Sequence, residues 1–338
     1  MHEIVITRHG GPEVMVECER PTPEPGPGEV RIRVKAAGVN FADILARMGL
    51  YPEAPPPPLV VGYEVSGYVD AVGPGPARHE IGRHVLAVTR FGGYAEHVIA
   101  PADFVWGVPA NLSHNEAASI PIAYLTAVVA LSRMANLRSG ETILIHSAGG
   151  GVGIAATQLA RLRRANVIGT ASPGKHSALR AMGIDHVLDP ADGRLESEVA
   201  RITNGRGVDV VLDPRGGESL AQSYGLLAPL GRLVVYGSQA LVVGRVRSEE
   251  AVQSFLQQRP LFDPMDLMNG NKGVFGLNLS RLWGERRFAG ASMEALLTDF
   301  AGGRLKAVVA KAFPLARAAE AHAFMQDREN VGKVVLTV

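Results

Sequence analysis

The chain has 338 residues, of which 46% are hydrophobic, and its 34 Lys and Arg nearly balance its 33 Asp and Glu. This length allows about two domains with a substantial buried core, and the balanced charge argues against nucleic acid as a partner. Cys18 is the single cysteine, which excludes an intrachain disulfide and a multi-cysteine zinc site. The amino terminus lacks the features of a signal peptide, and no stretch reaches the roughly 18 unbroken apolar residues of a membrane span. We therefore expect a cytoplasmic protein.

Residues 1–118 have the pattern of a β domain. Apolar and polar side chains alternate in short runs such as EVRIRVKAAGV (29–39) and RHVLAV (83–88), and Pro and Gly clusters separate the runs. The pattern predicts a twisted, mostly antiparallel sheet. The closing run GKVVLTV (332–338) predicts a strand that returns to this domain, so we assign residues 273–338 to it as well.

Residues 119–272 follow a different pattern, in which short apolar runs alternate with helical spacing. The runs TILIH, NVIGT, HVLD, VDVVLD and RLVVYG are typical of buried parallel strands with crossover helices. The fold class is therefore α/β, with a doubly wound parallel sheet beside the β domain. Residues 240–272 predict an amphipathic surface helix, although their arginines also suit an anionic carrier such as coenzyme A.

A glycine-rich turn lies between the first of these strands and the following helix. Gly149, Gly150 and Gly151 allow the backbone to turn tightly, and Gly153 allows the helix to pack against the strand. The amides at the start of the helix, including that of Val152, suit a pyrophosphate. Within a strand–helix–strand unit the turn predicts a dinucleotide site of the Rossmann type, and the alternative is a tight loop without a ligand.

The end of the next strand indicates which dinucleotide binds. An acidic residue there would accept from a ribose 2′-hydroxyl, but the segment reads Gly-Thr170-Ala-Ser172. Ser172 and Lys175 instead offer donors for a 2′-phosphate, so NADPH is the predicted cofactor and NADH the alternative. Lys175 could also simply occupy an exposed helix start.

Several motifs together resemble a known family. GVNFAD (38–43), GYE (62–64), AGGGVG (148–153) and VVYG (234–237) resemble the zinc-independent quinone oxidoreductases of the medium-chain dehydrogenase/reductase superfamily. IPIAYLTA, GTASPGKH and NVGKVVL are most similar to the VAT-1 homologue group, and NFADILARMGLYP is also similar to polyketide synthase enoyl reductase domains. The resemblance implies a GroES-like catalytic domain (1–118 and 273–338), a Rossmann domain (119–272) and a homodimer.

The resemblance also bears on metal binding. Zinc-dependent members carry Cys-His where this chain has Asn40-Phe41, and Gly-His-Glu where it has Gly62-Tyr63-Glu64. Two ligand positions have thus lost their ligand atoms, and zinc needs three or four ligands at fixed geometry. We expect no metal.

The same resemblance assigns roles to individual residues. Asn40 matches an asparagine beside the nicotinamide, Tyr51 matches a tyrosine that lines the same cleft, and Tyr63, at a vacated zinc-ligand position, is a possible proton donor. These three are the candidate catalytic residues, with a turn-capping amide, an aromatic wall and a structural hydroxyl as their respective alternatives. Asp43 is expected to anchor a local turn or to pair with Arg47. The candidate cofactor contacts are Asn40, Thr126, Gly150, Gly151, Val152, Thr170, Ser172, Lys175, Tyr236, Gly237, Phe275, Leu277 and Asn330.

These features predict an oxidoreductase that transfers a hydride from NADPH to a conjugated carbonyl compound. Such an acceptor spreads negative charge over several atoms, so a few hydrogen-bond donors can stabilise it without a Lewis acid. Quinone reduction is the first expectation, and reduction of an enoyl thioester or alkenal double bond is the second. A non-catalytic nucleotide-binding or membrane-associated protein is the third.

Overall fold

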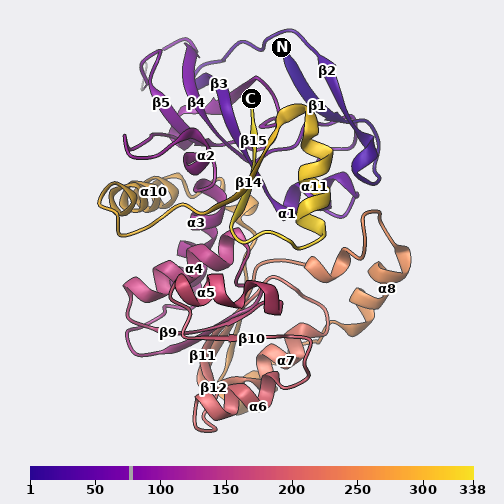
Figure 1. Cartoon of the computed structure of the whole chain (residues 1–338), viewed down its shortest axis with the longest axis vertical. Coiled ribbons are helices and arrows are strands. Elements are labelled where there is room, and N and C mark those ends of the chain that lie inside the picture. The colour runs from indigo at the N-terminus through magenta and orange to yellow at the C-terminus, as the bar shows by residue number, and fades with distance from the viewer. Residues whose placement is uncertain (76–78) are drawn as a thin grey trace. The chain divides into compact units, whose positions relative to one another are not determined.

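The computed structural model describes residues 1–75 and 79–338, and these divide into two units (Figure 1). Unit 1 comprises Met1–Leu125, Gly244–Arg247 and Leu279–Val338. Unit 2 comprises Thr126–Val243 and Ser248–Asn278.

Unit 1 is built on a mostly antiparallel sheet. The strands of that sheet are β3 (Glu29–Val39), β4 (Glu64–Val72), β5 (His84–Val88), β6 (His97–Pro101), β7 (Val105–Gly107), β14 (Val309–Pro314) and β15 (Lys333–Thr337), and β1 (His2–Ile6) and β2 (Met15–Glu19) form a separate two-stranded sheet. The helices of unit 1 are η1 (Pro12–Val14), α1 (Phe41–Arg47), η2 (Ala102–Phe104), α2 (His114–Ala117), η6 (Leu279–Leu282), α10 (Arg286–Ala301), η7 (Leu315–Arg317) and α11 (Ala318–Gln326), and α3 (Pro121–Val128) begins here.

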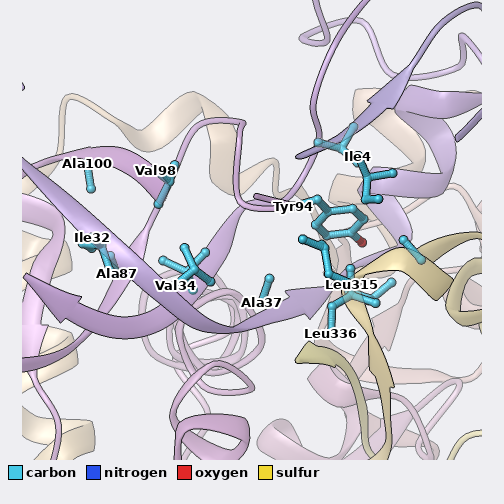
Figure 2. Close-up of a cluster of buried hydrophobic side chains, with 14 of the residues drawn as sticks. Ile4, Ile32, Val34, Ala37, Ala87, Tyr94, Val98, Ala100, Leu315 and Leu336 are labelled. Carbon is cyan, nitrogen blue, oxygen red and sulfur yellow. The ribbon is translucent and has the colours of Figure 1, made fainter. Parts of the chain in front are cut away.

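The order of the main sheet in unit 1 explains how distant segments meet. The strands run β14-β15-β3-β4-β5-β7, with β6 also paired to β3, and β15 is antiparallel to β3. The predicted antiparallel domain and the return of the final strand to it are confirmed, and Figure 1 shows β15 in yellow beside β3 in indigo. Alternate side chains of these strands form one apolar core, part of which Figure 2 shows.

Unit 2 has a six-stranded parallel sheet in the order β10-β9-β8-β11-β12-β13. The strands are β8 (Thr142–Ile145), β9 (Asn166–Thr170), β10 (His186–Leu188), β11 (Val208–Asp213), β12 (Leu227–Val235) and β13 (Gly273–Gly276). The helices are η3 (Val129–Met134), α4 (Gly151–Leu162), η4 (Pro173–Lys175), α5 (His176–Ala181), α6 (Leu195–Ile202), α7 (Ser219–Gly225), η5 (Gln239–Leu241), α8 (Glu249–Gln258) and α9 (Pro264–Gly270). The chain order reverses between β8 and β11, as in a doubly wound fold.

Two segments lie in a different unit from the one that the sequence predicts. The strand β13, within the range 273–338 assigned to the catalytic domain, pairs with β12 in unit 2. Residues 244–247, within the predicted Rossmann range, belong to unit 1, because Arg245 pairs with Asp327 and Arg247 donates to the carbonyl of Gly49. The first boundary lies after Leu125 rather than after residue 118.

One helical stretch, His114–Met134, is long and apolar enough to cross a membrane by length and composition alone. Unbroken apolar runs do not reveal this stretch, because a few polar residues interrupt it. In the described part of the chain 72% of its most apolar window is buried, and core helices meet the same criteria.

Candidate active site

Asn40 lies between β3 and α1, and its side chain is held from two sides. Its Oδ1 accepts from Lys333 Nζ on β15, and its Nδ2 donates to Glu64 Oε1 at the start of β4 over 2.9 Å. Because an ammonium group can only donate, the contact with Lys333 fixes which side of the amide carries oxygen. The N–H groups of Asn40 therefore face the Glu64 side.

Glu64 and Lys333 form an ion pair inside unit 1. Nζ lies 2.6 Å from Oε1, and the two side chains are only 0% and 6% exposed. Glu64 Oε2 also accepts from the backbone N–H of Ile122 at 2.7 Å. Lys333 is not predicted from the sequence, because 293 residues separate it from Asn40 and a strand lysine is usually exposed.

Asp43 joins the two segments that carry the candidate catalytic residues. Its carboxylate accepts from the backbone amides of Asn40 at 2.7 Å and Gly62 at 3.0 Å, and from the Tyr94 hydroxyl at 3.1 Å. The expectation that Asp43 anchors the local turn is confirmed. Gly62 has φ +105°, and a Cβ there would lie 2.7 Å from Gly93 Cα, so this approach requires glycine.

The environment of Asp43 differs from the expectation in the partner of its neighbour Arg47. The alternative pairing with Arg47 is wrong, because the guanidinium donates instead to His322, Gln326 and two backbone carbonyls. Complete burial raises the pKa of Asp43 to about 7, and its hydrogen bonds and the charge of Lys333 oppose that rise. The sequence itself carries no sign of this shift.

Tyr51 and Tyr63 belong to an aromatic wall. The ring of Tyr63 packs edge-on against Tyr51, with centroids 6.0 Å apart, and in a tilted arrangement against Phe91, with centroids 5.3 Å apart. The Tyr51 hydroxyl donates to Ser280 Oγ at 3.0 Å. The Tyr63 side chain is 6% exposed, yet within the described residues its hydroxyl has no hydrogen-bond partner. Buried hydroxyls normally have partners, so this one is available to a ligand.

In unit 2 the predicted strand, glycine turn and helix are confirmed. The helix α4 begins at Gly151 with Gly150 as its N-cap. A Cβ on Gly153 would lie 2.7 Å from Ala148 Cα, which accounts for glycine at this close contact. The first-turn amides of α4, including that of Val152, have no partner within the helix and carry its positive end. These amides suit a phosphate.

The carboxyl ends of β8, β9 and β11 are joined by a buried polar network. Thr170 Oγ1 lies 3.1 Å from His146 Nδ1, and His146 Nε2 lies 3.1 Å from Ser223 Oγ. Ser223 donates to Asp213 Oδ2 at 2.7 Å. Burial lowers the pKa of His146 to about 4, so the ring is neutral at neutral pH. The hydroxyl of Thr170 thus already has a protein partner.

The other candidate cofactor contacts of unit 2 follow its strands. Ser172, which is exposed, and Lys175, which is half-buried, form the turn after β9. Tyr236 and Gly237 follow β12, and Leu277 follows β13, which contains Phe275. Parallel strands end at one edge, so these residues share the edge that also carries the glycine turn.

Two candidate contacts are not on the strands of this sheet or in the turns that follow them. Thr126 is buried on α3. Asn330 lies in unit 1, where its Nδ2 donates to the carbonyl of Gly332 at 2.8 Å. Their cofactor roles stay predictions.

The two positions that carry zinc ligands in zinc-dependent relatives hold Asn40 and Tyr63 in this chain. Across residues 1–75 and 79–338, no group of three or more His, Cys, Asp or Glu side chains has the arrangement to hold a metal ion. Cys18 is a free, half-buried thiol. The donors at these positions are an amide and a phenol, which are hydrogen-bonding groups rather than zinc ligands.

Comparison with known proteins identifies the family. Residues 26–110 match the alcohol dehydrogenase GroES-like domain, and residues 182–336 match the zinc-binding dehydrogenase family. The chain is 36% identical to the human synaptic vesicle membrane protein VAT-1 homolog over 98% of its own length and 85% of that protein. The chain belongs to the medium-chain dehydrogenase/reductase superfamily. It is an oxidoreductase of that superfamily with a GroES-like and a Rossmann part.

Solved members of the superfamily have closely similar folds. A mycobacterial protein complexed with NADPH is 32% identical, with a TM-score of 0.89 and full coverage of both chains. A quinone oxidoreductase of Pseudomonas syringae pv. Tomato is 29% identical, with a TM-score of 0.88 over 100% of this chain and 99% of that one. The CurK enoyl reductase is 30% identical, with a TM-score of 0.85 over 99% and 98%.

Proposed function

We propose that the chain is an NADPH-dependent reductase of conjugated carbonyl compounds, with quinones as its first substrate class. The proposal is carried by the buried hydroxyl of Tyr63, which has no hydrogen-bond partner among residues 1–75 and 79–338. Reduction of a conjugated carbonyl leaves negative charge on oxygen, and a donor in a dry, apolar setting stabilises such charge strongly. The rings of Tyr51 and Phe91 give Tyr63 that setting.

Asn40 supports the same reaction. Its amide is orientated by Lys333 and Glu64, which take its oxygen and one N–H. Nδ2 also lies 3.5 Å from the carbonyl of Gly38, a length at which a hydrogen bond is weak, so the second N–H is the donor left for a substrate oxygen. A donor that is already orientated costs no reorganisation when charge develops on the substrate. Neither Asn40 nor Tyr63 is a Lewis acid. Oxidation of an alcohol at these side chains would need a Lewis acid to lower the pKa of the alcohol. The donor set therefore favours an acceptor that delocalises its own charge.

The residues of unit 2 fit NADPH. The amides at the start of α4 would hold the diphosphate, and Ser172 and Lys175 would bind the 2′-phosphate. No acidic side chain stands at residues 169–172 to repel that phosphate. When bound, NADPH supplies the hydride. The solved NADPH complex of a 32% identical protein supports this choice of cofactor.

The test is turnover by the purified chain. NADPH and NADH are each supplied with benzoquinone, with an alkenal and with crotonyl-CoA, and oxidation of the cofactor is followed by its absorbance. We expect the highest kcat/KM for NADPH with benzoquinone. Absence of turnover with every conjugated acceptor would reject the proposal and favour a nucleotide-binding role.

Reduction of an enoyl thioester is the second candidate function. Its specific support is the fold similarity to the CurK enoyl reductase. In the same panel, a higher kcat/KM for crotonyl-CoA than for benzoquinone would select this function.

We also propose a homodimer. Among the described strands of unit 2, β13 is at the edge of the sheet and has a free pairing side. Light scattering on the purified chain tests it, and a monomeric mass would reject it. The cytoplasmic location stays a prediction, since the human relative is named a synaptic vesicle membrane protein.

A further inference from the structure

We infer that Arg47 is a positioning residue, which holds the Asp43 carboxylate beneath the candidate active site through a directed chain of hydrogen bonds. The inference deepens the proposed function and rests on it wherever enzyme activity is measured. It stands on the arrangement of four buried side chains in unit 1.

The chain of contacts is continuous and contained in unit 1. Arg47 Nη1 lies 3.1 Å from His322 Nδ1, and His322 Nε2 lies 3.1 Å from the hydroxyl oxygen of Tyr94. The Tyr94 hydroxyl lies 3.1 Å from Asp43 Oδ2. All four side chains are buried. Figure 2 shows the Tyr94 ring inside the apolar cluster.

The direction of these hydrogen bonds follows from the first donor. A guanidinium has only donors, so His322 Nδ1 must accept from Arg47 and cannot carry a proton. The neutral ring then carries its proton on Nε2 and donates it to the oxygen of Tyr94. The single hydroxyl proton of Tyr94 is left for Asp43. Every bond in the chain thus points toward the carboxylate.

Arg47 thereby opposes protonation of Asp43. The carboxylate accepts from Tyr94 and from the amides of Asn40 and Gly62, so all three neighbours donate to it. A protonated Asp43 could donate to Tyr94 only if the Tyr94 hydroxyl turned to donate to His322 and His322 moved its proton from Nε2 to Nδ1. Reversal would place N–H of the histidine Nδ1 against N–H of Arg47, which is repulsive.

The charges around the carboxylate agree with this assignment. Burial raises the pKa of Asp43, while the Asn40 and Gly62 amides, Lys333 and the Tyr94 hydroxyl lower it. Burial and the neighbouring guanidinium lower the pKa of His322 well below its usual value, which keeps the ring neutral. With a pKa of about 7, Asp43 is near its titration midpoint at neutral pH, so its donors decide what fraction of it is ionised.

In the part of the chain that the structure describes, the hydrogen bonds of Arg47 include no ion pair with a carboxylate. Its remaining acceptors are neutral, namely the carbonyls of Gly10 and Arg245, both at 3.2 Å, and Gln326 Oε1 at 2.8 Å. Burial lowers the pKa of Arg47 to about 10, although the nearby charge of Glu13 raises it, so the group is still charged at neutral pH. A buried cation without a touching carboxylate is expensive for folding. Fixing the direction of the hydrogen bonds from Arg47 to Asp43 requires a group that always donates and never accepts, and a charged guanidinium is such a group.

The first test does not need activity. In 15N-histidine-labelled protein, NMR reports which ring nitrogen of His322 carries the proton, and a His322→Gln sample assigns the signal. We expect protonation at Nε2 alone throughout the neutral pH range. A proton on Nδ1, or a charged ring, would overturn the inference whether or not the enzyme turns over.

The second test uses the pH profile of kcat/KM. Arg47→Met removes the donor, so the acid limb should move to higher pH by about one unit or more, because the carboxylate loses support. Arg47→Lys keeps a donor, so the acid limb of its kcat/KM profile should lie close to that of the unmodified protein. Arg163→Met is the control, since this half-buried arginine of unit 2 donates to Leu159 and Ser132. It should leave the limb in place.

If Arg47→Met does not fold, the inference can still be tested with a second variant. Tyr94→Phe removes the last donor of the chain with little change in shape, and the same upward movement is expected. An unmoved limb in Tyr94→Phe would overturn the inference. If no conjugated acceptor is turned over by the unmodified protein, the proposed function fails, and the NMR result alone decides the inference.

Discussion

Substitution of Tyr63 by Phe should raise stability and lower activity together. The hydroxyl is buried, with the side chain 6% exposed, and has no partner among the described residues. A buried polar group without a partner costs about 1 to 3 kcal/mol. Phe keeps the ring contacts with Tyr51 and Phe91 and removes that cost. We therefore expect the free energy of unfolding of unit 1 to rise by about 1 kcal/mol or more.

The kinetic effect of the same change has the opposite sign. If Tyr63 donates to the charged oxygen of the substrate, its loss should lower kcat by about 100-fold to 1,000-fold, as for other donors of this kind. Binding of NADPH should hardly change, because the substitution removes no group from unit 2.

Urea unfolding followed by tryptophan fluorescence measures the stability term. Both tryptophans, Trp106 and Trp283, lie in unit 1, where each packs against Phe104, so the signal reports the unit that carries the substitution. Tyr68→Phe on β4 is the matched control, and its expected effect is within about 0.5 kcal/mol with normal kcat. A loss of stability in Tyr63→Phe, or an unchanged kcat, would refute the reasoning.

Three further outcomes are expected. Lys333→Met leaves the carboxylate of Glu64 buried and unpaired, so urea unfolding should show a loss of about 3 to 5 kcal/mol. A second substitution, Glu64→Gln, should recover much of it, and additive losses would contradict the pairing. Lys175→Ala should raise KM for NADPH about 10-fold to 100-fold and leave KM for NADH nearly unchanged, and equal effects on both cofactors in steady-state kinetics would exclude a 2′-phosphate contact. Folding raises the pKa of Asp43 from 3.8 to about 7, so between these values the folded chain holds a proton that the unfolded chain has lost. This group therefore lowers the unfolding free energy by about 1 kcal/mol per unit as pH rises from 4 to 7. Asp43→Asn should abolish that contribution in urea titrations at several pH values, and parallel pH dependences of the two proteins would contradict the shift.

Local patterns predicted most of the fold. Alternation predicts β3 and β5 of unit 1, the closing run predicts β15, and the run TILIH with its glycine turn predicts β8 and α4. The strand β13 was missed, because GVFG has four residues and no apolar alternation, and only its pairing with β12 defines it. Patterns within a short window cannot report a strand that long-range pairing creates.

The candidate site was predicted only in part for the same reason. Asn40 and Tyr63 lie in recognisable motifs, whereas Lys333 and His322 lie in ordinary sequence on elements far along the chain. Their roles depend on the pairing of β15 with β3 and on the packing of α11. The raised pKa of Asp43 follows from complete burial, which the sequence does not display.

The ion pair that anchors Asn40 constrains the order in which the protein folds during its synthesis. Glu64 is synthesised long before its partner Lys333, which lies on β15 and follows Asn40 by 293 residues. Until then the carboxylate has to stay hydrated, and the interior of unit 1 has to remain open at that point. The GroES-like part is therefore expected to close only once β15 has left the ribosome, whereas the Rossmann strands are all synthesised beforehand.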